Sequence, residues 1–217
     1  RTLTNKRSDM KKVLVSAGST SSPIDQVREI NNIIRGRTGA MIADYFVSQG
    51  VNCTLVTSAK PTNSRDLKVI GFRTFDDLKD IVEAEIKNGD YDAIIHSAAV
   101  SDYRVSRVLD RDLKPINAST KVSSSHSKLY LELESNIKIV DQIRTPWGFK
   151  GKLVKFKLQV GISDEELKLI AFKSMIVSQA DFIVANCLEW CRERAYIMGE
   201  DGLMANIKRD NLPAELF

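Results

Sequence analysis

The amino-acid sequence predicts an α/β fold with three layers and a mostly parallel sheet of the Rossmann-like kind. Strand and helix patterns alternate along the chain. Residues 92–100 form a continuous apolar run, which is typical of a central parallel strand buried on both faces. Two helix starts, at Thr74 and Ser163, have capping-box patterns. Residues 101–128 have no clear periodicity and predict a flexible lid loop, and the last part of the chain is expected to be β-rich.

Each predicted element has a local signal. The strands are apolar and β-branched runs or clean alternations, and they are expected over residues 11–18, 51–57, 67–74, 92–100, 128–134, 152–160, 181–186 and 194–198. The helices have apolar residues three and four positions apart, or a capping box. They are expected to begin near Gly36, Thr74, Ile137 and Ser163, and those from Thr74 and Ser163 to end near Gly89 and Gln179.

Composition places the chain among ordinary globular proteins, with 217 residues, 43% hydrophobic and 28% charged. The formal net charge of +4 equals the charge of residues 1–12, so the remainder is neutral and gives little reason to expect nucleic-acid binding. Residues 1–9 are expected to be a disordered leader or tag before a single α/β domain over 10–217. No run reaches the roughly 18 apolar residues of a membrane span. Three cysteines without an export signal favour a cytoplasmic location.

Several motif classes are absent. Residues 18–22, Gly-Ser-Thr-Ser-Ser, match neither the dinucleotide-binding nor the P-loop glycine pattern. No tyrosine is followed four positions later by lysine, which argues against a short-chain dehydrogenase. Cys187 and Cys191 have no histidine or second cysteine pair nearby, so no metal ligands are predicted. His96 lies in the apolar run and is expected to be a packed core residue rather than a base.

Polar and cationic residues remain at the ends of predicted elements. Residues 17–20 and 98–103 follow two of the strands, and residues 28–39 lie at the crossover into the first helix. Ligands of such sheets bind beyond the carboxyl ends of the strands, and a helix N-terminus at a crossover can hold a phosphate. The candidate site residues are Arg28, Asn32, Arg35, Arg37, Asp102, Lys121 and Asn186.

Five ordered motifs over about residues 11–200 resemble the phosphopantothenate–cysteine ligase family. The family's G-G-T, P-I-D-x-V-R, S-N and S-G-K-M-G segments resemble Ala17–Thr20 with Pro23–Arg28, Asn32 and Gly36–Gly39. Its A-A-V-A-D-[WY] motif resembles Ala98–Tyr103, and its flexible-loop lysine with the strand that follows resembles Lys121–Ser124 with Leu129–Glu134. Its [GS]-F-[AK]-x-E-T motif resembles the segment that begins with Lys155–Leu158, and its V-A-N motif resembles Val184–Asn186.

The resemblance implies a monofunctional, bacterial-type ligase of coenzyme A biosynthesis, which joins 4′-phosphopantothenate to cysteine through an acyl-nucleotide. It implies CTP rather than ATP, Mg²⁺ with the nucleotide, and a homodimer with shared active sites in which Arg28 and Asn186 act in trans. The implied catalytic residues are Asn32 and Lys121. The implied nucleotide-binding residues are Gly18, Ser19, Ala98, Ala99, Asp102, Lys121 and Phe156, and the implied substrate-binding residues are Arg28, Asn32, Gly36, Arg37 and Asn186.

The chain departs from the family pattern at several positions. Ser19 replaces a glycine, Ile33 and Ile34 replace a polar pair, Arg37 replaces lysine, and Gln159-Val160 stands where Glu-Thr is usual. The final helix of the family is expected to be missing after Phe217. Two alternatives therefore stay open: a nucleotide- or flavin-binding Rossmann-like oxidoreductase, and a non-catalytic homologue of the ligase.

Overall fold

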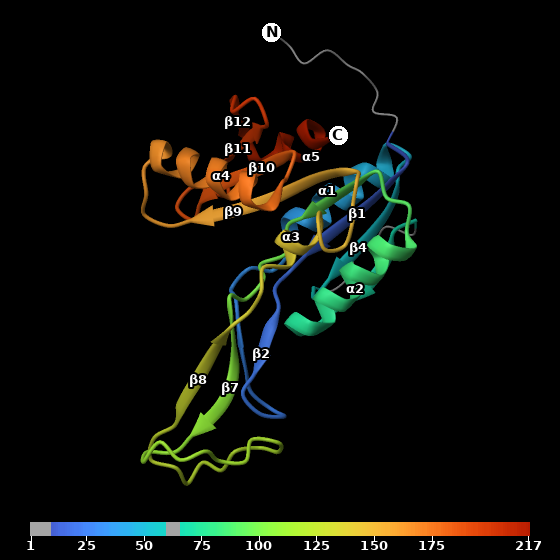
Figure 1. Ribbon diagram of the computed structural model, residues 1–217. Coiled ribbons are helices and arrows are strands. Elements are labelled where there is room, and N and C mark those ends of the chain that lie inside the picture. Colours follow the sequence, from blue (N-terminus) through green and yellow to red (C-terminus); the bar gives the residue numbers. More distant parts are fainter. Residues whose placement is uncertain (1–9, 60–65) are drawn as a thin grey trace.

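The computed structural model describes residues 10–59 and 66–217, and its centre is an eight-stranded sheet (Figure 1). The strand order is β12-β11-β10-β9-β6-β1-β4-β5, with the six strands from β10 to β5 parallel and β11 and β12 antiparallel. The strands are β1 (Lys12–Ala17), β4 (Asn52–Thr57), β5 (Lys68–Gly71), β6 (Ala93–His96), β9 (Lys152–Gln159), β10 (Phe182–Cys187), β11 (Arg194–Gly199) and β12 (Met204–Lys208).

Helices cover both faces of this sheet, which confirms the three-layer prediction. Alternate residues of the strands enter two separate cores. One core contains Val13 and Val15 with Phe46 of α1, and the other contains Leu14 with Leu78 of α2. The first face is covered by α1 (Arg37–Ser48) and α5 (Leu212–Leu216), which follows the 3-10 turn η1 (Arg209–Asn211). The second face is covered by α2 (Phe75–Asn88), α3 (Ile139–Gln142) and α4 (Asp164–Ser178).

The helix starts follow local sequence signals. In both predicted capping boxes, the side chains of Thr74 and Ser163 accept from the N3 backbone amide, and the N3 carboxylate accepts in return. Helix α1 instead begins after Gly36, which has a φ of +74°. A Cβ at this position would lie 2.5 Å from the amide nitrogen of Gly18, so only glycine fits the close approach of the two loops.

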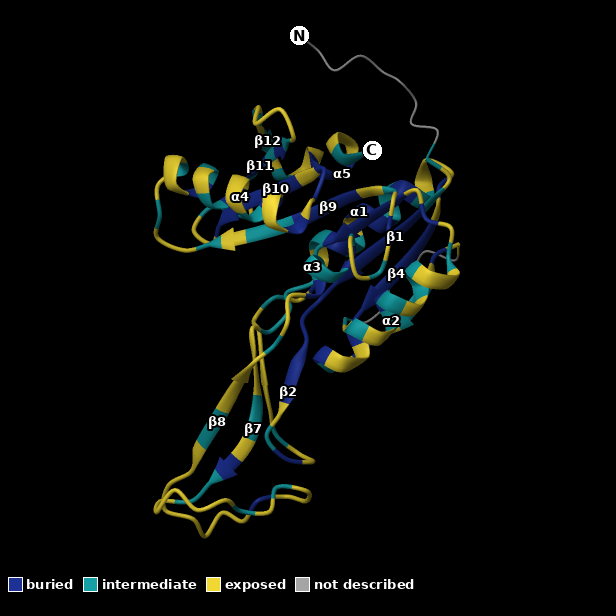
Figure 2. Cartoon of the chain, viewed as in Figure 1, coloured by how far each residue is buried: buried dark blue, intermediate teal, exposed yellow. Residues whose placement is uncertain are grey.

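Two short antiparallel ladders project from the sheet and form what we call the arm. They pair β2 (Ser21–Pro23) with β3 (Glu29–Asn31), and β7 (Tyr103–Leu109) with β8 (Tyr130–Ser135). The ladders are joined by a hydrogen bond of 2.7 Å from the Val105 amide to Ser22 Oγ. Residues 110–129 close the β7–β8 ladder far from the sheet (Figure 1). Most of the arm is exposed (Figure 2).

The structure corrects part of the predicted lid. Residues 101–128 were expected to be irregular, which is wrong for β7, because Tyr103–Leu109 pair with β8. This strand lies in a largely exposed ladder and buries little on either face, so it lacks the period-2 alternation that marks a half-buried strand. The sequence analysis also missed β2, β3, β12, η1 and α5, all of which are short. The prediction for residues 1–9 lies outside the described residues. In the part that the structure describes, no helix is long and apolar enough to span a membrane.

Candidate active site

The two strand ends that the sequence analysis singled out lie side by side. The amide of Ala99 donates to the carbonyl of Gly18 at 2.8 Å, and the amide of Thr20 donates to the carbonyl of Ala99 at 3.3 Å. From β1 the chain crosses to β4 on one side of the sheet, and later to β6 on the other. The gap between β1 and β6 is therefore a topological switch point, which is where sheets of this kind bind ligands.

A row of polar side chains crosses three neighbouring strands at this end of the sheet. Ser16, His96 and Lys155 are partners in register on β1, β6 and β9. His96 is 6% exposed, and its Nδ1 lies 2.9 Å from Ser16 Oγ. Burial, together with the nearby Lys155 ammonium, lowers the pKa of His96 to about 4. The imidazole is therefore neutral near pH 7, as expected of a packed core residue.

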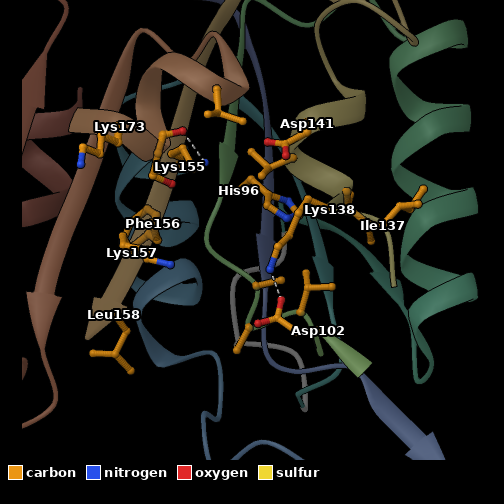
Figure 3. A pocket seen from close by; sticks show the side chains of 17 residues that line it. His96, Asp102, Ile137, Lys138, Asp141, Lys155, Phe156, Lys157, Leu158 and Lys173 are labelled. Atoms are coloured by element: carbon orange, nitrogen blue, oxygen red, sulfur yellow. Dashed lines mark hydrogen bonds and ion pairs between the residues drawn. The ribbon is translucent and has the colours of Figure 1, made fainter. Parts of the chain in front are cut away.

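A cavity of about 440 Å³ opens beyond the end of β6 and beside the second half of β9. Figure 3 shows His96 and Lys138 on one side of it, and Lys155, Phe156 and Lys157 on the other. Four lysines and two aspartates line the cavity, giving it a net charge of +2 and making it suited to a polyanion. These charged residues are Lys138, Lys155, Lys157, Lys173, Asp102 and Asp141.

Four of the predicted nucleotide-binding residues, Ala98, Ala99, Asp102 and Phe156, come together in this cavity. Asp102 forms an ion pair with Lys138 across it. The sequence analysis did not single out Lys138, Asp141, Lys155, Lys157 or Lys173 as site residues. The only signal for any of them was the spacing of Lys155 and Lys157, which places both lysines on one face of a strand.

A second hollow, of about 800 Å³, lies beside the first and is lined by Ser19, Asn32, Ile33 and Ile34 among others. The side-chain amide of Asn32, which lines the second hollow, donates at 3.2 Å to the carbonyl of Ala99, which lines the first. Ser19 Oγ donates to Asn31 Oδ1 at 2.7 Å and holds the end of β3 against the β1 loop. An amide donor is thus held next to the cationic cavity.

Lys121 and Arg28 lie elsewhere, at the outer part of the arm. Asp25 is buried, and it accepts hydrogen bonds from the side chain and the backbone of Arg28 and, at 3.0 Å, from the amide of Val122. Arg28 also donates to the carbonyl of Val122 at 2.7 Å. The Arg28 guanidinium holds the pKa of Asp25 far below its usual range. This ion pair fixes the backbone next to Lys121, but neither cation lines the cavity.

The remaining predicted residues have different surroundings. Gly18 and Gly36 pack closely against each other, and Arg37 is exposed at the first position of α1. Asn186 is buried at the end of β10, one strand beyond β9, and does not line the cavity. One chain therefore brings Ala98, Ala99, Asp102 and Phe156 together and holds Asn32 next to them, but it does not bring Lys121, Arg28 or Asn186 to the cavity.

The cavity fits a metal that arrives with a nucleotide. Asp102 and Asp141 are its two carboxylates. Mg²⁺ is usually bound through one or two carboxylates together with substrate phosphates. In the part of the chain that the structure describes, no group of three or more His, Cys, Asp or Glu side chains could hold a metal ion.

The fold and the cavity define a three-layer α/β protein with a cationic cavity next to the switch point of its sheet. The chain belongs to the family of the DNA/pantothenate metabolism flavoprotein C-terminal domain, whose model matches residues 8–211. The family resemblance of the five motifs is thereby confirmed.

Individual relatives agree with this membership. The chain is 35% identical over 191 residues to the coenzyme A biosynthesis bifunctional protein CoaBC of Thermococcus kodakarensis, covering 87% of this chain and 44% of that protein. It thus spans less than half the length of this curated relative. A crystal structure of the DNA/pantothenate metabolism flavoprotein from Streptococcus pneumoniae matches with a TM-score of 0.85 and 30% identity, over 95% of this chain and 96% of the other. A Cab2 mutant in complex with phosphopantothenate-cysteine shares the fold, with a TM-score of 0.73 at 16% identity, over 95% of this chain and 85% of the other.

Proposed function

We propose that this chain is a phosphopantothenate–cysteine ligase of coenzyme A biosynthesis. In the proposed reaction, the carboxylate of 4′-phosphopantothenate attacks the α-phosphate of CTP and pyrophosphate leaves. The amine of cysteine then attacks the acyl carbon and releases CMP, and the amine proton passes to solvent. The observation that carries this proposal is the contact of Asn32 with Ala99, because it sets an amide donor beside a cavity with a net charge of +2. Membership of the pantothenate family and the name of the Thermococcus relative support the same reaction.

The cavity suits the first half-reaction. Attack on a phosphate that carries several negative charges depends on charge neutralisation more than on acid–base chemistry. The lysines from β9, α4 and the segment before α3 supply that neutralisation, and Mg²⁺ bound with the nucleotide adds to it. His96 is neutral near pH 7, so it adds no positive charge to the cavity. A pKa of about 4 also makes its imidazole a weak base, and no role as a base is assigned to it.

The second half-reaction is assigned to Asn32. As the amine attacks, negative charge develops on the acyl oxygen, and a fixed amide donor stabilises it. One N–H of Asn32 is engaged by the carbonyl of Ala99, which orients the side chain and leaves the other N–H for substrate. Substrate binding by Gly36 and Arg37, and nucleotide binding by Gly18 and Ser19, belong to the same proposal, because these residues surround the loop that carries Asn32.

A homodimer with shared active sites is part of the proposal. Lys121 and Arg28 are held at the arm, away from the cavity of their own chain, so a partner chain is needed to bring them to a nucleotide. The arm carries several large, exposed apolar side chains, as a surface buried by a second copy would: Val27, Ile30, Tyr103, Leu113, Tyr130 and Leu133. Asn186, which is also outside the cavity, is proposed to act in trans in the same way.

CTP rather than ATP is proposed as the nucleotide. Ala98 and Ala99 line the cavity, and Phe156 forms a wall of it against which a base can stack. A cytoplasmic location is proposed with the function, since three unpaired thiols suit a reducing compartment.

The proposal is tested by pyrophosphate release. The purified chain is mixed with 4′-phosphopantothenate and Mg²⁺, and with CTP or ATP in parallel. We expect release that requires phosphopantothenate and is faster with CTP. Tight nucleotide binding without release would favour the non-catalytic homologue. A bound chromophore absorbing near 450 nm, without release, would favour the flavin-dependent oxidoreductase.

A further inference from the structure

A buried ammonium group faces the cavity without a carboxylate in direct contact. Lys155 is 6% exposed, and its Nζ donates to the carbonyl of Ser174 at 2.9 Å and to Ser178 Oγ. Ser178 Oγ in turn donates to Asp141 Oδ1 at 2.7 Å. Among the described residues, no carboxylate oxygen lies within ion-pair distance of Lys155. An ammonium has three N–H donors, so one remains for the cavity.

Packing alone does not require a lysine at this position. Leu153, two residues earlier, lies on the same face of β9 and fills the core with an apolar side chain. A buried charge without a direct counter-charge is costly, and an apolar residue of similar size would join β9 to α4 at a lower cost. The position of Lys155 on the wall of a cationic cavity points instead to an anionic ligand.

We infer that Lys155 is a phosphate-binding residue of the nucleotide site, and that Ser178 and Asp141 are positioning residues that hold its ammonium toward the cavity. The remaining N–H donates to a phosphate oxygen of a bound nucleoside triphosphate. This assignment rests on the proposed function for the identity of the nucleotide, whereas the binding of a polyphosphate depends only on the cavity. Lys155 thus gives the cavity a hydrogen-bonded cation from its own chain, whereas Lys121 lies on the arm.

The charge of Lys155 makes binding sensitive to pH. Burial lowers the pKa of Lys155 to about 8, with Lys157 and Lys138 acting in the same direction and Asp141 in the opposite one. The other titratable groups that line the cavity with it are His96 of β6, Asp102 after β6 and Lys173 of α4. Triphosphate oxygens are already ionised above pH 7. Loss of the Lys155 proton should therefore weaken polyphosphate binding about tenfold between pH 7 and pH 9, as follows from a pKa near 8.

The test is calorimetric titration with Mg²⁺–CTP and, separately, with inorganic tripolyphosphate, at pH 7, 8 and 9. Lys155→Met keeps the length of the side chain and removes the charge. Lys150→Met is the matched control, since Lys150 is exposed and does not line the cavity. We expect Lys155→Met to bind both ligands about tenfold to 100-fold more weakly at pH 7, with no dependence on pH up to 9. Wild type and Lys150→Met should both lose about tenfold in affinity between pH 7 and pH 9.

The outcomes separate the two proposals. If Lys155→Met has unchanged affinity and an unchanged pH profile, even with a lower melting temperature, Lys155 only connects β9 to α4 and the inference is overturned. Binding of tripolyphosphate but not of CTP by wild type, lost in Lys155→Met, would support Lys155 and count against the proposed function. If wild type binds neither ligand, both are overturned. If Lys155→Met does not fold, Ser178→Ala is the alternative variant. It keeps the Lys155 amine but removes one hydrogen-bond acceptor of its ammonium form, so the midpoint of the pH profile of binding should move to lower pH. An unmoved midpoint contradicts the assignment.

Discussion

The buried His96 gives the fold a specific sensitivity to mild acid. Its pKa is about 4 in the folded protein, against about 6.5 when exposed. Between these values the unfolded chain binds a proton that the folded chain does not, so stability falls as the pH falls through the window from 6.5 to 4. A difference of 2.5 pKa units corresponds to about 3.4 kcal/mol over the whole window. About 2 kcal/mol of this is lost between pH 7 and pH 5.

The measurement is urea unfolding at pH 7 and pH 5, for wild type and His96→Asn. Asparagine keeps a partner for Ser16 Oγ and has no titration in this range. The chain has one other histidine, His126, which is exposed in the loop of the arm, so His126→Asn is the matched control. Carboxylates with lowered pKa values, such as Asp25 and Asp181, lose their contribution mainly below pH 5.

We expect wild type and His126→Asn to lose about 2 kcal/mol of unfolding free energy between pH 7 and pH 5, and His96→Asn to lose much less. Because each variant is compared with itself at two pH values, any general destabilisation by the substitution cancels. Equal losses in wild type and His96→Asn would refute the argument, since the imidazole would then titrate alike in the folded and unfolded chains.

Three further predictions concern catalysis. Lys121→Ala should lower kcat and kcat/KM together at an unchanged melting temperature, because Lys121 is exposed and has no core role; near-normal turnover at saturating CTP would remove it from the mechanism. Asn32→Asp should raise the activation free energy of cysteine attack by about 2.7–4 kcal/mol and change that of the activation step much less, so that mass spectrometry detects a retained acyl-cytidylate. Equal slowing of both steps would contradict the role of Asn32. Asp25→Asn should lower kcat in the same direction as Lys121→Ala, because it breaks the contacts that fix Val122 beside Lys121. A kcat equal to that of wild type would show that the position of Lys121 does not depend on this contact.

Most of the central domain could be predicted from the sequence because its signals are local. Capping boxes at Thr74 and Ser163 involve residues three positions apart, and the run at 92–100 is apolar because β6 is buried on both faces. Strand β7 of the arm was not predicted, because it buries little of either face and so lacks the alternation that marks a half-buried strand.

The site could be predicted only in part. Ala98, Ala99 and Asp102 were found because they follow a strand that ends at the switch point. Lys155 was not, since a lysine in an otherwise strand-like segment suggests solvent, and its burial depends on contacts with Ser174 and Ser178, about 20 residues away along the chain. Whether residues on the arm share a cavity with residues on the sheet depends on contacts distant in sequence, which no local pattern encodes.

We propose above that this chain forms the amide bond between 4′-phosphopantothenate and cysteine at the expense of CTP. The most direct measurement quantifies phosphopantothenoylcysteine, CMP and pyrophosphate in one reaction by liquid chromatography with mass spectrometry. We expect all three products to accumulate in equal amounts, and we expect a reaction without cysteine to leave an acyl-cytidylate and pyrophosphate but no CMP. Hydrolysis of CTP to CDP and phosphate, or the absence of the amide product with all substrates present, would contradict it.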